Sequence, residues 1–166
     1  MTIDGGAPRR TLHRVTDAVT LRPAAPQDLP FLTEMAARFG GAGPDSPAIR
    51  GWMVPDWDLG FIAERDGSPA GAGWWRRFTG FTGGGSDRTA REVFVAVAAA
   101  HEGTGLGSSL LDALIDAART TGAVHLLAAR PRHDVGTRML ETRGFERKDA
   151  PYPHVDPVWT LELRER

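Results

Sequence analysis

The hydrophobic positions of residues 92–97 form an almost uninterrupted apolar run, and the segment that follows it changes period. Valine alternates through this run, and an apolar stretch of this kind is typical of a central strand covered on both faces. Over residues 108–121, leucine and isoleucine recur at helical spacing, and Gly122 suits the left-handed conformation that ends a helix. Residues 123–129 are apolar again. The pattern therefore predicts a strand, a helix and a second strand in direct succession.

The pattern in the first half of the chain predicts three strands, a helix after the first strand and a short helix before the second. Residues 19–22 favour a short strand, and Asp28 stands where the N-cap of a helix with an apolar face would lie. Residues 60–65 and 69–78 favour two strands, and the Asp-Gly pair between them is typical of a tight hairpin turn. Before this hairpin, the residues up to Asp58 follow no clear period, so we expect a short helix within an irregular connection.

The last part of the chain predicts a short helix and a final strand. Residues 134–143 place Val135, Met139 and Leu140 on the inward face of a helix, and residues 158–163 favour a strand. Two adjacent strands in the first half and a strand, helix, strand unit in the second predict an α+β fold. We expect a mixed sheet with helices packed on it.

Length and composition limit the classes of protein to which the chain can belong. Its 166 residues fit a single domain over residues 18–166, after a polar and basic tail over residues 1–17 that we expect to be mobile. A net charge of −1 argues against a nucleic acid partner. With no cysteine and with scattered histidines, the chain offers no thiol nucleophile and no metal-ligand spacing.

Targeting and membrane signals are also not predicted by the sequence. The first residues lack the apolar core of a signal peptide, and nowhere do 18 consecutive apolar residues occur. We therefore expect a cytoplasmic protein that does not enter a membrane. The predicted C-terminal strand has an exposed edge, which is compatible with a homodimer.

A glycine-rich turn joins the predicted central strand to its helix. Residues 103–107 read Gly-Thr-Gly-Leu-Gly, and such a turn directs backbone N–H groups to the positive end of the helix dipole, where an anion binds. A dinucleotide turn starting at Gly103 would require glycine where Ser108 stands, and a triphosphate loop would require lysine followed by serine or threonine. The turn therefore fits a single pyrophosphate better than either nucleotide motif.

This turn and its neighbours resemble the GNAT superfamily of N-acetyltransferases, whose signature is Arg/Gln-x-x-Gly-x-Gly/Ala at the start of a helix. Residues 102–107 read Glu-Gly-Thr-Gly-Leu-Gly, and the strand over residues 92–97 precedes them. Residues 139–145 resemble the closing helix and Gly-Phe turn of the family. The resemblance covers residues 19–163 and implies the GNAT fold, a mostly antiparallel mixed sheet splayed at its centre with helices on both faces.

The resemblance implies that acetyl-coenzyme A is the cosubstrate. Its pyrophosphate would bind the backbone amides from Gly103 to Ser108, and its pantetheine arm would pair with the backbone of Val95 and Val97 where the central strand splays from its neighbour. The residues implied in binding the cosubstrate are Val95, Ala96, Val97, Glu102, Gly103, Thr104, Gly105, Leu106, Gly107, Ser108 and His133.

Several residues depart from the usual pattern of the family. Glu102 places a carboxylate where Arg or Gln commonly stands, and its charge would weaken pyrophosphate binding unless the side chain turns to solvent. Leu140 occupies the position that commonly carries a tyrosine acid, and leucine cannot donate a proton. His133 stands near a common asparagine position, and Gly136 replaces a commoner alanine.

The mechanism that the resemblance implies is direct attack of a neutral amine on the thioester, which needs a base and an acid. Glu92 matches a position that carries the base in some family members, and a carboxylate paired to Arg91 or to a loop is an equally consistent interpretation. Tyr152, the only tyrosine, or His154 would reach the thioester as the acid from the turn before the last strand. A packed aromatic residue is the commoner role for such a tyrosine.

We therefore expect an N-acetyltransferase that transfers an acetyl group from acetyl-coenzyme A to a primary amine of a small molecule or a protein. The alternative is a catalytically weak GNAT-fold module that binds acyl-coenzyme A, motivated by Glu102 and Leu140. No feature of the sequence identifies the amine.

Overall fold

The computed structural model describes residues 18–47, 49, 57–77, 90–129, 131, 133–149 and 157–163, and the structural statements below concern these residues. The predicted tail over residues 1–17 lies outside them. So do Tyr152 and His154, the two candidates for the acid.

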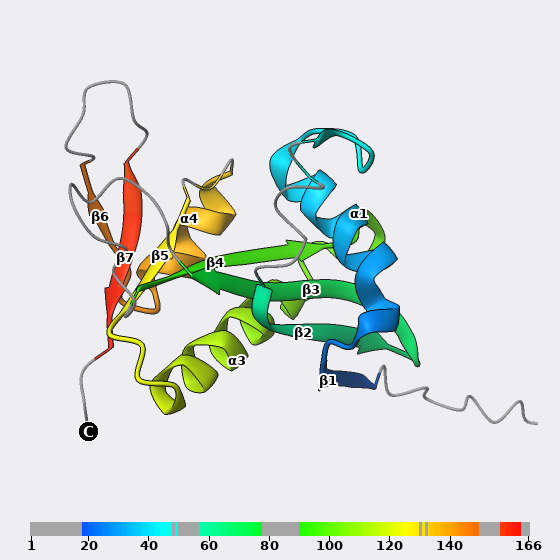
Figure 1. Cartoon of the computed structure of the whole chain (residues 1–166), viewed down its shortest axis with the longest axis horizontal. Helices are drawn as coiled ribbons and strands as arrows, with labels where there is room; N and C mark the ends of the chain where they lie inside the picture. The colour runs from blue at the N-terminus through cyan, green and yellow to red at the C-terminus, as the bar shows by residue number, and fades with distance from the viewer. Residues whose placement is uncertain are drawn as a thin grey trace, which may run out of the picture.

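The described residues form a seven-stranded sheet with the order β1-β2-β3-β4-β5-β7-β6 (Figure 1). All neighbouring strands pair antiparallel except β4 and β5, so the sheet is mixed and mostly antiparallel, as predicted. The strands are β1 (Val19–Pro23), β2 (Trp57–Arg65), β3 (Ser68–Arg77), β4 (Ala90–Val97), β5 (His125–Ala128), β6 (Glu146–Lys148) and β7 (Val158–Glu162). The helices are α1 (Leu29–Gly40), α3 (Leu106–Thr120) and α4 (Asp134–Glu141), with 3-10 turns η1 (Pro26–Asp28) and η2 (Ala99–His101).

The predicted hairpin between β2 and β3 is confirmed by its backbone angles. Asp66 has φ of 51° and Gly67 has φ of 77°, and two successive positive values are what a type I′ turn requires. This turn sets the antiparallel register in which Arg65 pairs with Ser68.

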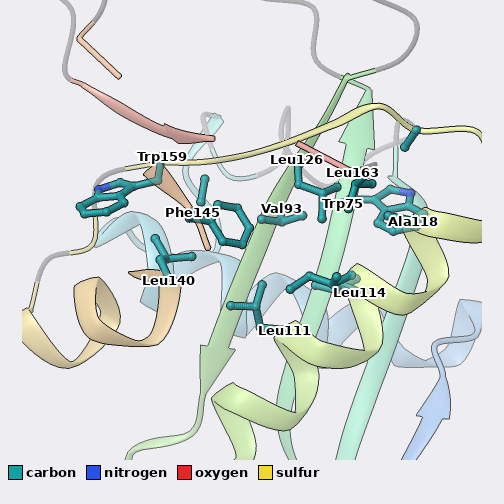
Figure 2. Close-up of a cluster of buried hydrophobic side chains, with 13 residues drawn as sticks. Trp75, Val93, Leu111, Leu114, Ala118, Leu126, Leu140, Phe145, Trp159 and Leu163 are labelled. Atoms are coloured by element: carbon teal, nitrogen blue, oxygen red, sulfur yellow. The ribbon is translucent and has the colours of Figure 1, made fainter. Parts of the chain in front are cut away.

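Adjacent tryptophans on β3 anchor the two faces of the sheet. Trp74 packs in the cluster beneath α1 and stacks on Phe94 of β4 with ring centroids 5.5 Å apart. Trp75 points to the other face, into the cluster between the sheet and α3, where Val93 and Leu114 lie beside it (Figure 2). Both indoles are 2% exposed, so each is a core residue. Helices therefore cover both faces, α1 on one and α3 on the other (Figure 1).

Two glycines of β3 allow α3 to approach the sheet closely. A Cβ atom at Gly71 would lie 3.2 Å from Leu110 Cδ1, and one at Gly73 would lie 3.1 Å from Leu114 Cδ1. These distances are shorter than ordinary carbon contacts, so side chains at either position would push α3 away from β3. The small residues thus fix where α3 begins relative to the end of β4.

Two predicted element boundaries are wrong. Strand β2 begins at Trp57, inside the segment that lacked a clear period, although the helical residues Pro47 and Ile49 agree with a short helix in that connection. Helix α3 begins at Leu106 rather than at Ser108, because Gly105 already serves as its N-cap. Because glycine adopts the left-handed region readily, the turn ends at Gly105, three residues before Ser108.

Two predictions in the C-terminal part are also wrong. Val135 is 73% exposed, because α4 turns Met139 and Leu140 inward together with Gly136, which packs on Pro131. Strand β6 was not predicted, and its three residues are all exposed. Because β6 pairs with β7, the C-terminal strand is not the edge of the sheet that was expected to support a homodimer.

Candidate functional site

The pairing of β4 with β5 stops halfway along β4. Residues 90–93 pair with β5, whereas β3 pairs with β4 as far as Val97. The Ala98 N–H donates to the Ala70 carbonyl at 2.9 Å, so the alternation of an antiparallel ladder directs the N–H and C=O groups of Val95 and Val97 away from β3. Among the described strands, none pairs with this edge beyond Val93. The splay that the resemblance implied is therefore present, and we call residues 94–97 on that side the open edge of β4.

A left-handed turn connects the open edge to α3. Gly103 has φ of 70° and Gly105 has φ of 85°, values that side chains other than glycine rarely adopt. No described atom lies within 4 Å of the position that a Cβ would take at either glycine, so the outer side of the turn is open. The Thr104 hydroxyl donates to the His101 carbonyl at 2.6 Å and closes the turn. The first N–H groups of α3, which have no partner within the helix, therefore lie next to the open backbone of Gly103 and Gly105.

The first turn of α3 is held on both sides. Leu106 is 2% exposed and packs in a cluster with Leu110, against which Val95 and Val97 also lie. A Cβ at Gly107 would lie 3.6 Å from both the Val97 side chain and Met139 Sδ, which places this turn between β4 and α4. The helix start and the open edge are thus fixed relative to each other by packing.

Arg143 adds a polar connection between α4 and the same turn. Its guanidinium donates to both carboxylate oxygens of Asp112, at 2.5 and 2.8 Å, and to the Ser108 carbonyl at 3.3 Å. A further hydrogen bond from the same guanidinium reaches the Met139 carbonyl at 3.1 Å. These contacts tie the end of α4 to the half-buried Ser108 region of α3.

Glu102 is paired with a basic residue of α1. Arg38 Nη2 donates to Glu102 Oε1, and Arg38 Nε donates to the Val97 carbonyl at 2.8 Å. The two side chains are 39% and 62% exposed, respectively. The negative charge of Glu102 beside the predicted pyrophosphate site is therefore compensated by Arg38. Arg38 is 64 residues away in the sequence, so local sequence patterns did not reveal this pair.

Glu92, the predicted base, lies opposite Arg76 in the register of β3 and β4. Arg76 Nε donates to Glu92 Oε2 at 2.9 Å, and Arg76 Nη2 lies 2.9 Å from the same oxygen. The guanidinium also lies 5.4 Å from the ring centroid of Phe94. The described partner of Glu92 is thus Arg76 rather than Arg91 or a loop, and this pair shares a sheet face with Trp74 and Phe94 beneath α1.

The departures on α4 have structural explanations. A Cβ at Gly136 would lie 2.7 Å from the Cβ of Pro131, so the commoner alanine does not fit there without a shift. Leu140 is 4% exposed and packs in the cluster with Phe145 and Trp159 (Figure 2), where its contacts are entirely those of a core residue. His133 is the exposed N-cap of α4, in an extended conformation.

Other features of the described residues lie apart from this site. A depression of about 250 Å³ is lined by residues of β6, β7 and Gly144, none of which is a predicted site residue. The described residues contain no group of three or more His, Asp or Glu side chains that could hold a metal ion. No helix in the described part is long and apolar enough to span a membrane.

Comparison with known proteins gives one family and many similar folds. The sequence profile of the acetyltransferase (GNAT) family matches residues 31–145. The structure of yncA from Salmonella typhimurium, which includes its cofactor acetyl-CoA, superimposes with a TM-score of 0.69 at 23% identity, covering 90% of this chain and 96% of that one. Ribosomal-protein-alanine N-acetyltransferase from Brucella melitensis gives a TM-score of 0.68 at 21% identity, covering 87% and 99%. No curated protein sequence matches the chain.

Proposed function

The chain belongs to the acetyltransferase (GNAT) family, and we propose that it is an N-acetyltransferase that transfers the acetyl group of acetyl-coenzyme A to a primary amine. The observation that carries this proposal is the succession of the open edge of β4, the left-handed glycine turn and the start of α3. The three features follow one another within residues 94–108. An elongated ligand with an amide-bearing arm and a pyrophosphate needs backbone partners and an anion site in this order.

The residues present fit this cosubstrate. The N–H and C=O groups of Val95 and the N–H of Val97 lie on the open edge of β4, where an extended ligand could form the hydrogen bonds of an added strand. The space beside Gly103 and Gly105 allows an anion to approach the backbone amides closely. Both observations come from the geometry of this chain. They support the binding of the cosubstrate that the family resemblance implies.

When bound, acetyl-coenzyme A supplies an acetyl thioester that is activated toward amines. The chain orients it through the backbone of β4 and α3, and we assign to Glu92 the acceptance of a proton from the ammonium of the acceptor. Both contacts from Arg76 go to Oε2, so Oε1 is the oxygen that we assign to this proton. We assign the protonation of the leaving thiolate to Tyr152, because buried Leu140 has no proton to give.

A pair of measurements tests the proposal. Acetyl-coenzyme A should raise the midpoint of thermal unfolding, because a ligand at 100 times its Kd stabilises the folded state by about 2.7 kcal/mol. A panel of primary amines should then release free coenzyme A thiol. Stabilisation without thiol release would favour the acyl-coenzyme A-binding or regulatory module, to which the buried Leu140 points. If neither stabilisation nor a binding isotherm were seen, both functions would be excluded.

Single substitutions then test the two catalytic assignments. Glu92→Gln should lower kcat by roughly 100-fold or more while the stabilisation by acetyl-coenzyme A remains, and Tyr152→Phe should lower kcat at unchanged KM for acetyl-coenzyme A. Asp116→Asn, an exposed change on α3, is the matched control for Glu92→Gln. Unchanged kcat in both site variants would remove the assignments and leave the transfer itself intact.

A further inference from the structure

The contact between Arg38 and Glu102 joins α1 to the glycine turn at the place assigned to the pyrophosphate. Arg38 lies in the last turn of α1, and its guanidinium spans the Val97 carbonyl and the Glu102 carboxylate. With the carboxylate 62% exposed, a pair of this kind adds little to folding stability. The role of the Arg38–Glu102 pair is therefore inferred from where the pair lies and not from its contribution to stability.

We propose that Arg38 is a positioning residue for the cosubstrate, which holds Glu102 in place directly after η2 and cancels the negative charge that Glu102 would otherwise present to the pyrophosphate. This proposal rests on the function proposed above. Arg and Gln commonly occupy the position of Glu102 in the family that the chain resembles. In this chain the positive charge comes instead from α1, across the end of the sheet (Figure 1).

The second contact of Arg38 determines how far the open edge extends. The Val97 carbonyl is the last acceptor on that edge, and Arg38 Nε occupies it at 2.8 Å. The arm of the cosubstrate is therefore left with the groups of Val95 and the N–H of Val97, immediately before the glycine turn. Arg38 thus marks the point at which strand-like pairing ends and anion binding begins.

The native chain and three variants compare three net charges of the Arg38–Glu102 pair. The pair is neutral in the native chain and in the double variant Arg38→Met/Glu102→Gln, carries −1 in Arg38→Met, and carries +1 in Glu102→Gln. One unit charge beside an exposed anion site changes the affinity by roughly threefold to tenfold at low salt. The expected order of affinity for coenzyme A is Glu102→Gln, then the native chain and the double variant together, then Arg38→Met.

Isothermal titration calorimetry with coenzyme A at low and high salt measures this order directly. High salt should compress the differences, because exposed charges are then screened. In steady-state kinetics, the same changes should appear in the KM for acetyl-coenzyme A rather than in kcat. Arg119→Met is the matched control, since Arg119 forms an exposed pair with Asp116 at the far end of α3, about 20 Å along the helix from the turn.

Three outcomes would overturn the inference. The double variant binding as weakly as Arg38→Met would show that charge cancellation is not the role of Arg38. Equal affinity of all four proteins would show that the pair does not act on the cosubstrate. An equal loss in Arg119→Met would show a general charge effect. If the native chain itself bound no coenzyme A, the proposed function would fail, which is a distinct result.

Discussion

Two arginines connect the region of α1 to the sheet, and their carboxylate partners differ in burial. Arg22 of β1 donates to both oxygens of Asp28, at 2.7 and 2.8 Å, and to Glu64 of β2 at 2.7 Å. Arg38 of α1 instead contacts Glu102 and the Val97 carbonyl. The side chain of Asp28 is 7% exposed and that of Glu102 is 62% exposed. The two arginine side chains are similarly exposed, at 35% and 39%, so the pairs differ in the burial of the carboxylate.

The difference in carboxylate burial indicates that the Arg22–Asp28 pair contributes more to folding than the Arg38–Glu102 pair, for which we proposed a role in binding. Asp28 also accepts the Ala25 N–H at 2.8 Å, so its carboxylate closes the η1 turn as well as binding Arg22. Hydrogen bonds from Arg22 hold the pKa of Asp28 below its usual value. Removing one partner of a buried pair leaves the other uncompensated, whereas an exposed pair is screened by water. We therefore expect the largest effects on stability at Asp28 and the smallest at Arg38.

The largest effect is expected for Asp28→Ala. This change removes the two hydrogen bonds that Arg22 donates to Asp28 and leaves the Ala25 N–H without its acceptor, so the free energy of unfolding should fall by about 2–3 kcal/mol in urea denaturation. The control is Asp116→Ala, whose carboxylate is 76% exposed and which should change stability by no more than about 0.5 kcal/mol. Equal losses in the two variants would refute the comparison.

The pH dependence of the same pair gives the next effect. Because the pKa of Asp28 is lowered in the folded state, its contribution to stability is complete above the unfolded value of about 3.9 and is lost as the pH falls through the folded pKa. The difference in unfolding free energy between the native chain and Asp28→Asn should therefore be constant from about pH 7 to pH 5 and shrink below about pH 4. A difference that grew on acidification would contradict the assigned pKa direction.

A smaller effect is expected for Glu64→Gln. Glu64 accepts one hydrogen bond from Arg22, and its side chain is 21% exposed, between the two extremes. The free energy of unfolding should fall by about 1 kcal/mol, measured by urea denaturation at pH 7. Glu162→Gln, which removes the exposed and longer contact to Lys148, is the control and should be close to neutral. A loss as large as that of Asp28→Ala would show that burial does not order these effects.

The smallest effect is expected for Arg38→Met. Its stability should lie within about 0.5 kcal/mol of the native chain, because both members of the pair are solvated. The same variant is expected to lose affinity for coenzyme A. A loss of more than about 1 kcal/mol in unfolding free energy, with unchanged affinity for coenzyme A, would show that Arg38, like Arg22, contributes to folding stability instead.

Local patterns predicted the elements whose signals lie within a few neighbouring residues. The turn at Asp66 and Gly67 and the glycine turn before α3 follow from backbone preferences. Strand β6 has three exposed residues and no apolar period, so it left no pattern to detect. Val135 was misplaced because it stands four residues before Met139, which puts both on one side of a helix, whereas the structure buries Leu140 and leaves Val135 73% exposed.

In the candidate site, too, features set by neighbouring residues could be predicted, whereas contacts between distant residues could not. The backbone of the turn could be predicted because its three glycines lie within five residues of sequence, 103–107. The partner of Glu102 could not, because Arg38 is 64 residues away and only the packing of α1 on the sheet brings the two together. Glu92 likewise meets Arg76 through the register of β3 and β4. The role of Tyr152 remains a prediction, since it lies outside the described residues.

The open edge of β4 also bears on aggregation. Unpaired strand edges are where foreign chains add to a sheet, and the outer edges here are β1, with five residues, and β6, with three. Strand β6 consists of Glu146, Arg147 and Lys148, and charge discourages such addition. The unpaired groups of β4 lie instead in the interior of the sheet, between β3 and β5. Strand β4 can therefore keep these groups unpaired without forming an outer edge to which a strand of another molecule could add.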